Sequence, residues 1–169
     1  MRIVLIGFMG SGKSTVGKAL AQKLGYDFIE MDNLILEQST YGSIAKIFAE
    51  KGEPYFRDLE TSTAKSLTDR RDVVISTGGG TPSRNENILA LKNSETLIVY
   101  LTISFDTART RIGNDSTRPL WQDLAKTREL FTSREPIYHS AADLVVNSES
   151  DIDSIVSTIQ HSLLKGGNS

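Results

Sequence analysis

The feature that most constrains the fold is a short apolar run that ends in a glycine-rich loop. The run Ile3–Ile6 is continuous and stops at a glycine, a pattern typical of a strand buried on both faces. The next residues, Gly7–Ser14 (GFMGSGKS), match G-x-x-x-x-G-K-[ST]. A helix is predicted over Lys13–Leu24, because apolar residues recur there on one helical face and Gly25 follows as a stop. A buried strand, a glycine loop and a helix in this order predict an α/β fold whose loop binds phosphate.

Further apolar runs alternate with helical patterns along the rest of the chain. The other predicted strands are Asp27–Met31, Val73–Ile75, Thr96–Leu101 and Leu144–Val146. The other predicted helices are Leu34–Gln38, Ile44–Lys51, Arg57–Arg70, Asn87–Leu91, Phe105–Ile112, Leu124–Glu135 and Ile152–Leu164. The segment Gly113–Gln122 has turn and charged residues and predicts a loop. Five strands in alternation with helices predict a three-layer α/β fold, in which helices cover both faces of a parallel sheet. Ligands of such sheets bind beyond the carboxyl ends of the strands.

Length and composition exclude several classes of protein. A chain of 169 residues suits one domain, residues 1–169. It contains no cysteine, which excludes a disulfide scaffold, a zinc–thiolate site and cysteine catalysis. A net charge of −2 argues against a nucleic-acid partner. No apolar stretch approaches the roughly 18 residues that span a bilayer, and the first residues do not form a signal or transit peptide. We therefore expect no membrane partner and a cytoplasmic location.

The glycine-rich loop predicts a nucleotide site. Its glycines let backbone N–H groups surround phosphate oxygens, and the helix that follows directs its positive dipole end at the same anion. Lys13 would reach the β- and γ-phosphates, and the Ser14 hydroxyl would bind Mg²⁺. The candidate nucleotide ligands here are Gly10, Ser11, Gly12, Lys13, Ser14 and Thr15. We find no Asn-Lys-x-Asp segment for guanine, so a kinase of a small molecule fits the length better than a GTPase.

Carboxylates at the end of the second predicted strand are the first candidates for the acceptor side. Glu30 and Asp32 are two residues apart at this point. One could orient a hydroxyl and take its proton, while the other could hold Mg²⁺ through water. The alternative is an ordinary acidic pair in which Asp32 caps the next helix.

Arginines and glycines supply the other acceptor candidates. Arg57 and Glu60 are spaced i, i+3 on a predicted helix, so the carboxylate could fix a guanidinium for an anionic ligand, or the two could form an ordinary surface pair. Three glycines follow the strand Val73–Ile75, which indicates close approach to the backbone or simply a flexible turn. Arg118 and Arg134 add cations that could bind phosphate or carboxylate, or could be solvated. Two arginines and one aspartate together favour a kinase for a small hydroxy acid.

With these motifs in order, the chain resembles the shikimate kinase family. The resemblance runs from Arg2 to about Asn147. The matching segments are Gly7–Gly17 (GFMGSGKSTVG), Phe28–Asp32 (FIEMD), Ser43–Glu60 (SIAKIFAEKGEPYFRDLE), Ile75–Gly80 (ISTGGG), Arg118–Leu120 (RPL) and Arg134–Tyr138 (REPIY). The resemblance implies a P-loop kinase fold like that of nucleoside monophosphate kinases, with a five-stranded sheet. It also implies an acceptor-binding helical region at about residues 32–62 and a short lid at about 112–123.

The resemblance further implies a reaction and roles for individual residues. The γ-phosphoryl group of ATP would pass to the 3-hydroxyl of shikimate, with Mg²⁺ as cofactor, in aromatic amino-acid biosynthesis. On the acceptor side, Asp32 would contact the shikimate hydroxyls as base or orienting group. Arg57 and Arg134 would clamp the carboxylate of shikimate, Glu60 would hold Arg57, and the Gly79 N–H would contact the substrate. On the donor side, the implied contacts are Lys13 and Arg118 to the transferring group, Ser14 to Mg²⁺, Arg111 to adenine and Asn147–Asp151 at its border.

Two residues depart from the family pattern, and two other functions stay open. The family usually has Asp-x-Asp after the second strand, where this chain has Glu30, and Trp121 stands where an aliphatic residue is common. The open alternatives are a kinase of the same fold for another hydroxy acid, such as gluconate, and a nucleotide-binding protein without turnover. The resemblance also implies a monomer.

Overall fold

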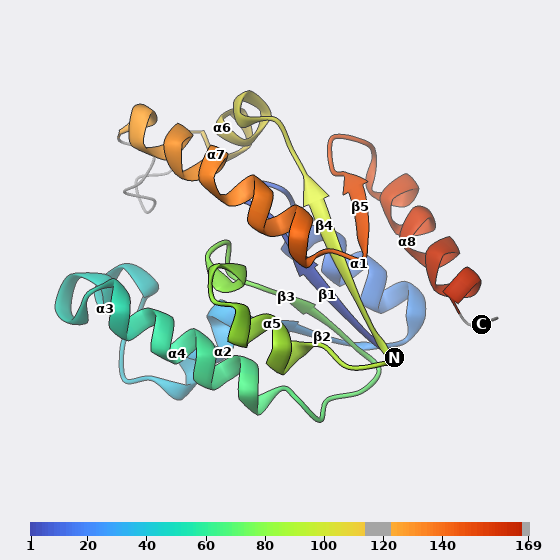
Figure 1. The fold of residues 1–169 in the computed structure, drawn as a ribbon, viewed down its shortest axis with the longest axis horizontal. Helices are drawn as coiled ribbons and strands as arrows, with labels where there is room; N and C mark the ends of the chain where they lie inside the picture. Colours follow the sequence, from blue (N-terminus) through green and yellow to red (C-terminus); the bar gives the residue numbers. More distant parts are fainter. Residues whose placement is uncertain (114–122, 167–169) are drawn as a thin grey trace.

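The computed structural model describes residues 1–113 and 123–166. Its strands are β1 (Arg2–Ile6), β2 (Asp27–Glu30), β3 (Val73–Ser76), β4 (Thr96–Thr102) and β5 (Leu144–Asn147). Its α-helices are α1 (Lys13–Leu24), α2 (Met31–Gln38), α3 (Ile44–Lys51), α4 (Glu53–Ser66), α5 (Asn85–Leu91), α6 (Phe105–Ile112), α7 (Leu124–Ala141) and α8 (Ile152–Gly166), with a 3₁₀ turn η1 at Thr81–Ser83. The predicted alternation of strands and helices is therefore confirmed (Figure 1).

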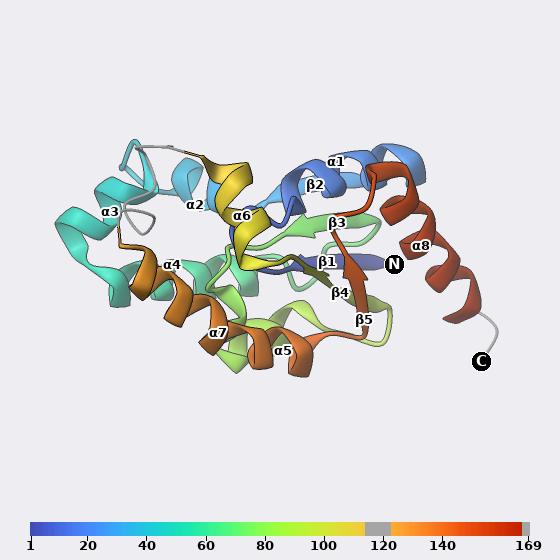
Figure 2. The same cartoon turned by 90° about the horizontal axis from the view of Figure 1, so that it is seen from above.

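The five strands form one parallel sheet in the order β2-β3-β1-β4-β5. Strand β1 lies at its centre, and all five of its residues are buried. Ile3 and Leu5 pack with α1 and α8 on one face, while Val4 and Ile6 pack with α4, α5 and α7 on the other. Figure 2 shows these two helical layers on either side of the sheet. The three-layer α/β prediction is confirmed, and the carboxyl ends of the strands share one edge.

Helices α2, α3 and α4 form a smaller unit beside this edge. Ile35, Ile47 and Phe56, one from each helix, make a separate apolar cluster. Figures 1 and 2 both show α3 extending away from the sheet. The unit covers the range predicted for the acceptor-binding region, so its position next to the strand ends suits that role.

Several predicted boundaries were wrong, each for a physical reason. The predicted strand Asp27–Met31 ends at Glu30, because Met31 is buried under the sheet as the first residue of α2. Helix α4 spans Glu53–Ser66 and not Arg57–Arg70. Its start has a proline in the first turn, where the missing N–H costs nothing. Beyond the end of α4, the buried guanidinium of Arg2 donates hydrogen bonds to the carbonyls of Thr68 and Arg70.

The predicted helix Leu124–Glu135 continues to Ala141 through Pro136. A proline inside a helix costs about 3 kcal/mol. Tyr138, two residues further, is buried in the core, and its burial offsets this cost. No helix within the described ranges is both long and apolar enough to cross a membrane.

Candidate active site

A cavity of about 380 Å³ lies at the carboxyl ends of the strands. Three predicted motifs contribute to its wall: the glycine-rich loop, the end of β2 and the loop after β3. The lining residues are Met9, Gly10, Gly12, Lys13, Ser14, Thr15, Glu30, Asp32, Thr77, Gly78, Gly79 and Arg111. Segments that are far apart in the sequence therefore meet where the sheet topology predicts a ligand.

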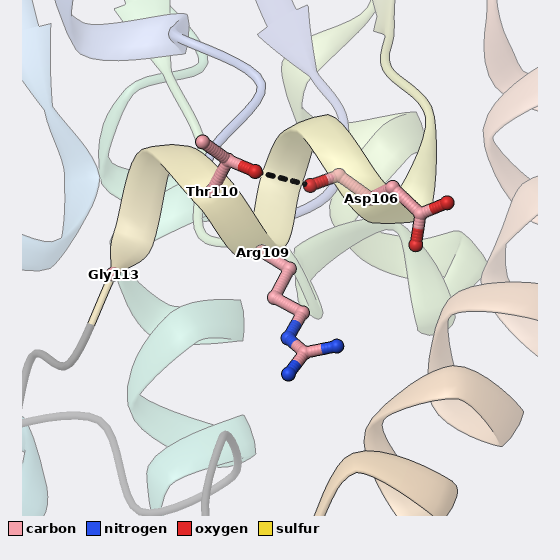
Figure 3. Close-up of a pocket in the computed structure, with 4 residues that line it drawn as sticks. All are labelled: Asp106, Arg109, Thr110 and Gly113. Carbon is pink, nitrogen blue, oxygen red and sulfur yellow. Dashed lines mark hydrogen bonds between the residues drawn. The ribbon is translucent and has the colours of Figure 1, made fainter.

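A second depression, of about 410 Å³, lies on α6 and contains none of these motifs (Figure 3). The described residues that line it are Asp106, Arg109, Thr110 and Gly113. The Thr110 hydroxyl donates to the Asp106 carbonyl at 3.0 Å, an ordinary bond one turn back along the helix. We therefore place the candidate active site in the cavity at the strand ends.

The glycine-rich loop has a backbone that requires its glycines. Gly10 and Gly12 have φ of 83° and 84°, in the left-handed region that side chains disfavour. Gly12 precedes α1, so the N-terminal end of this helix faces the loop. Lys13 Nζ donates to the carbonyls of Gly7 at 2.7 Å and Phe8 at 3.1 Å, which holds the ammonium over the loop. The loop and its lysine form an anion site at a helix N-terminus.

Ser14, Glu30 and Ser76 are joined by hydrogen bonds beside the loop. The Ser14 hydroxyl donates to the Glu30 carboxylate, whose Oε1 also accepts from Ser76 at 2.8 Å. Oxygen ligands of this kind suit Mg²⁺. Within residues 1–113 and 123–166, no group of three or more His, Asp or Glu side chains is arranged to hold a metal alone. The donor set therefore fits a cation that arrives with nucleotide phosphates, as Mg²⁺ commonly does.

Asp32 is a half-buried residue in the first turn of α2. Burial, followed by the charges of Glu60 and Glu30, raises its pKa to about 6, although Lys13 and Arg57 oppose this shift. Its Oδ1 is buried and accepts no hydrogen bond from the described residues, and the helix has no side-chain cap. The capping alternative for Asp32 is therefore wrong. A buried acceptor beside the phosphate site is suited to a donor from a ligand, such as a hydroxyl.

Arg57 is held by carboxylates from its own helix. Its guanidinium pairs with Glu60 and, at 3.0 Å, with Glu53. Glu60 is fully buried, and its Oε1 accepts from Thr81 at 2.8 Å. Burial and the bond from Thr81 fix the carboxylate that orients Arg57, so the pair is not an ordinary surface ion pair.

The three glycines after β3 provide space for these charged groups. A Cβ on Gly78 would lie 2.7 Å from Glu60 Oε1 and 3.0 Å from Asp32 Oδ1. A Cβ on Gly80 would lie 2.5 Å from the Arg57 Cζ. The distances to Glu60 and to Arg57 are too short for a real Cβ, so the glycines allow close approach and the flexible-turn alternative is wrong.

Helix α7 brings a second arginine to the same loop. Arg134 is largely buried, and a Cβ on Gly79 would lie 3.5 Å from its Nη1. One turn later, the buried Tyr138 donates to the Gly79 carbonyl at 2.6 Å. No role for Tyr138 was predicted from the sequence, although Tyr138 belongs to the same REPIY motif as Arg134. The i, i+4 spacing of these two residues on one helix was the signal that could have linked them.

Arg111 joins the glycine-rich loop to the segment after β5. Its guanidinium donates to the carbonyls of Gly10 at 3.2 Å and Ser148 at 2.8 Å. The predicted border segment Asn147–Asp151 therefore lies near the nucleotide loop. Arg118 lies outside the described residues, as do Trp121 and most of the predicted lid.

Comparison with known proteins gives consistent matches. The family model for shikimate kinase matches residues 9–164. A shikimate kinase of Chlorobium phaeobacteroides is 41% identical over 94% of this chain and 86% of its own length. One of Persephonella marina is 43% identical over 87% of this chain and 88% of its own length.

Solved structures agree with these matches. Shikimate kinase from Acinetobacter baumannii, in complex with shikimate, has a TM-score of 0.90 and 32% identity, and the match covers 99% of this chain and 95% of that one. A gluconokinase from Sinorhizobium meliloti has a TM-score of 0.61 and 19% identity, covering 97% and 91%, which is a likeness of fold alone.

Proposed function

Since the chain belongs to the shikimate kinase family and is an ATP-dependent kinase of shikimate, we propose that phosphoryl transfer takes place in the cavity at the strand ends. The observation that carries this proposal is the buried Oδ1 of Asp32, which has no donor among the described residues and lines the same cavity as Lys13. An acceptor hydroxyl that donates to this oxygen lies next to the phosphate site. The gluconate and non-catalytic alternatives are not favoured.

On the donor side, the glycine-rich loop binds the phosphates of ATP through its backbone N–H groups. Lys13 neutralises charge on the transferring group, and its bonds to the loop carbonyls keep it close to that position. Ser14, with Glu30 nearby, would hold Mg²⁺. When bound, this ion supplies charge neutralisation on the phosphate oxygens. The proposed nucleotide role of Arg111 is supported by its bond to Gly10.

On the acceptor side, Arg57 and Arg134 bind the carboxylate of shikimate, and Glu60 holds Arg57 in place. The Gly79 N–H donates to the substrate. Asp32 accepts the proton of the 3-hydroxyl while the oxygen of that hydroxyl forms a bond to the γ-phosphorus of ATP. The bond from that phosphorus to the bridging oxygen breaks, and ADP leaves. A carboxyl with a pKa of about 6 is ionised at neutral pH and is a better proton acceptor than an ordinary aspartate.

Three finer assignments rest on the sequence and its resemblance. We propose that Arg118 stabilises the transferring phosphoryl group from the segment at about residues 112–123. We propose a monomer, which the family resemblance implies. We propose a cytoplasmic location, which the absence of cysteine fits.

The test is ADP release by the purified protein with ATP and Mg²⁺, using shikimate, gluconate, AMP or no acceptor. We expect rapid release with shikimate and only background release with the others. Release with gluconate at the same rate would overturn the assignment of the acceptor pocket. Nucleotide binding without release under any condition would favour the non-catalytic alternative.

A further inference from the structure

Two serines hold the Glu30 carboxylate between them. Glu30 and Ser76 are the last residues of β2 and β3, and they are direct neighbours in the register of the parallel pair. Ser76 is fully buried and donates to Glu30 Oε1 at 2.8 Å. The other carboxylate oxygen, Oε2, accepts from the exposed Ser14 hydroxyl at the start of α1. Both serine hydroxyls therefore donate to the same carboxylate, and Glu30 is the acceptor in each hydrogen bond.

This direction of the Ser14 bond has a chemical consequence. A neutral hydroxyl is a weak ligand for a divalent cation, and its lone pairs must face the ion. When the Ser14 hydroxyl donates a hydrogen bond to a carboxylate, its lone pairs are left for the cation and its oxygen becomes more electron-rich. Outer carboxylates act in this way on metal-ligating side chains, and removing them typically weakens metal binding about 10–100-fold.

We infer that Ser76 and Glu30 are positioning residues that orient the Ser14 hydroxyl toward the metal of the nucleotide. Glu30 acts by a direct hydrogen bond to Ser14, and Ser76 fixes the rotamer of Glu30 from within the sheet. The longer side chain of glutamate lets one carboxylate span both serines. The inference rests on the proposed function, which makes Ser14 the metal ligand.

The experiment measures metal affinity apart from turnover. Mn²⁺ is the probe, and free Mn²⁺ is followed by electron paramagnetic resonance in the presence of the protein and saturating ADP. The variants are Ser76→Ala, Glu30→Gln and Ser14→Ala. Ser66→Ala is the matched control, since its hydroxyl also makes a 2.8 Å bond, but to the Thr63 carbonyl within α4. ADP affinity without metal is measured by calorimetry, and thermal unfolding checks that each variant is folded.

We expect Ser76→Ala and Glu30→Gln to weaken Mn²⁺ binding about 10-fold or more, while ADP affinity without metal changes less than about twofold. Glutamine preserves size, but its amide group donates to a serine and so competes for the lone pairs that a metal needs. If one of these two variants fails to fold, the other still decides the question. If ADP affinity without metal falls as much as Mn²⁺ affinity does in these variants, the substitutions damage the loop in general, and the inference is overturned.

The Ser14→Ala variant separates this inference from the proposed function. If it loses Mn²⁺ affinity while Ser76→Ala and Glu30→Gln keep theirs, the positioning role is wrong and Ser14 remains the ligand. If Ser14→Ala keeps full Mn²⁺ affinity, the metal role of Ser14 is wrong and the positioning role is overturned with it.

Discussion

Replacing Gly80 with alanine tests the acceptor site through a single methyl group. Gly80 has φ −93° and ψ −9°, which any L-residue adopts, so alanine causes no backbone strain there. The new Cβ would lie 2.5 Å from both the Cζ and the Nη2 of Arg57. Because the obstructed atoms are the end of a flexible side chain, the protein folds and Arg57 moves. The predicted effect is thus a displaced guanidinium in an otherwise unchanged cavity.

The size of the effect follows from the contacts that Arg57 makes. A hydrogen bond to a charged group is worth about 1.5–3 kcal/mol, and each 1.4 kcal/mol is about tenfold in affinity. We therefore expect the KM for shikimate to rise about 10–100-fold in Gly80→Ala, with the KM for ATP within about twofold. Glu60 keeps its bond from Thr81 but loses that from Arg57, so the free energy of unfolding falls by about 1–3 kcal/mol.

Steady-state assays of ADP release, with shikimate and ATP varied in turn, measure both KM values. Gly42→Ala is the control, since a Cβ on Gly42 meets no atom within 4 Å. If Gly80→Ala acts through Arg57, the double variant Gly80→Ala/Arg57→Ala has the same shikimate KM as Arg57→Ala alone. An unchanged shikimate KM in Gly80→Ala, or additive effects in the double variant, would refute this reasoning.

Three further substitutions test other parts of the site. Asp32→Asn should lower kcat about 100-fold or more with ATP affinity nearly unchanged, because the hydroxyl loses its proton acceptor; equal turnover would exclude that role. The raised pKa of Asp32, about 6, means that the folded state binds this proton more tightly than the unfolded one. The resulting stability is present below pH about 4 and is lost as pH rises through about 6, so the variant should be up to about 3 kcal/mol more stable than the wild type at pH 8 and little different at pH 4. Urea unfolding at both values measures this, and a difference independent of pH would contradict it. Arg134→Ala should raise the KM for shikimate at least about tenfold and leave that for ATP unchanged; ADP-release assays with each substrate varied will show whether it does. Tyr138→Phe removes the hydrogen bond to the Gly79 carbonyl. We therefore expect the free energy of unfolding in urea to fall by about 1 kcal/mol and the KM for shikimate to rise. If both values stay unchanged, this bond does not position the Gly79 loop.

The sheet and the nucleotide loop could be predicted from the sequence because their signals are local. Strand β1 contains the continuous apolar run Ile3–Ile6, and helix α1 was predicted with its observed limits, Lys13–Leu24. The glycines and the lysine of the loop have fixed spacing, so neighbours along the chain are neighbours in space. The order of the strands in the sheet, by contrast, is a property of packing between distant segments.

The properties of the acceptor site depend on contacts between distant segments. The raised pKa of Asp32 comes from burial and from Glu60, which belongs to another helix. The continuation of α7 through Pro136 depends on where Tyr138 is buried, and local propensity alone predicts a stop. The bond from Ser76 to Glu30 requires the register of two strands separated by three helices. Periodicity within one segment contains none of this information.

The central place of β1 also affects how the chain is made. Its two partners in the sheet, β3 and β4, begin only about 65 and 90 residues after β1 ends. At a synthesis rate of about 5–20 residues per second, an emerging β1 waits roughly 5–20 s before both neighbours leave the ribosome. During that time its apolar residues and unpaired backbone are open to contact with other nascent chains. The strand that leads into the nucleotide loop is therefore the strand that waits longest for its partners during translation.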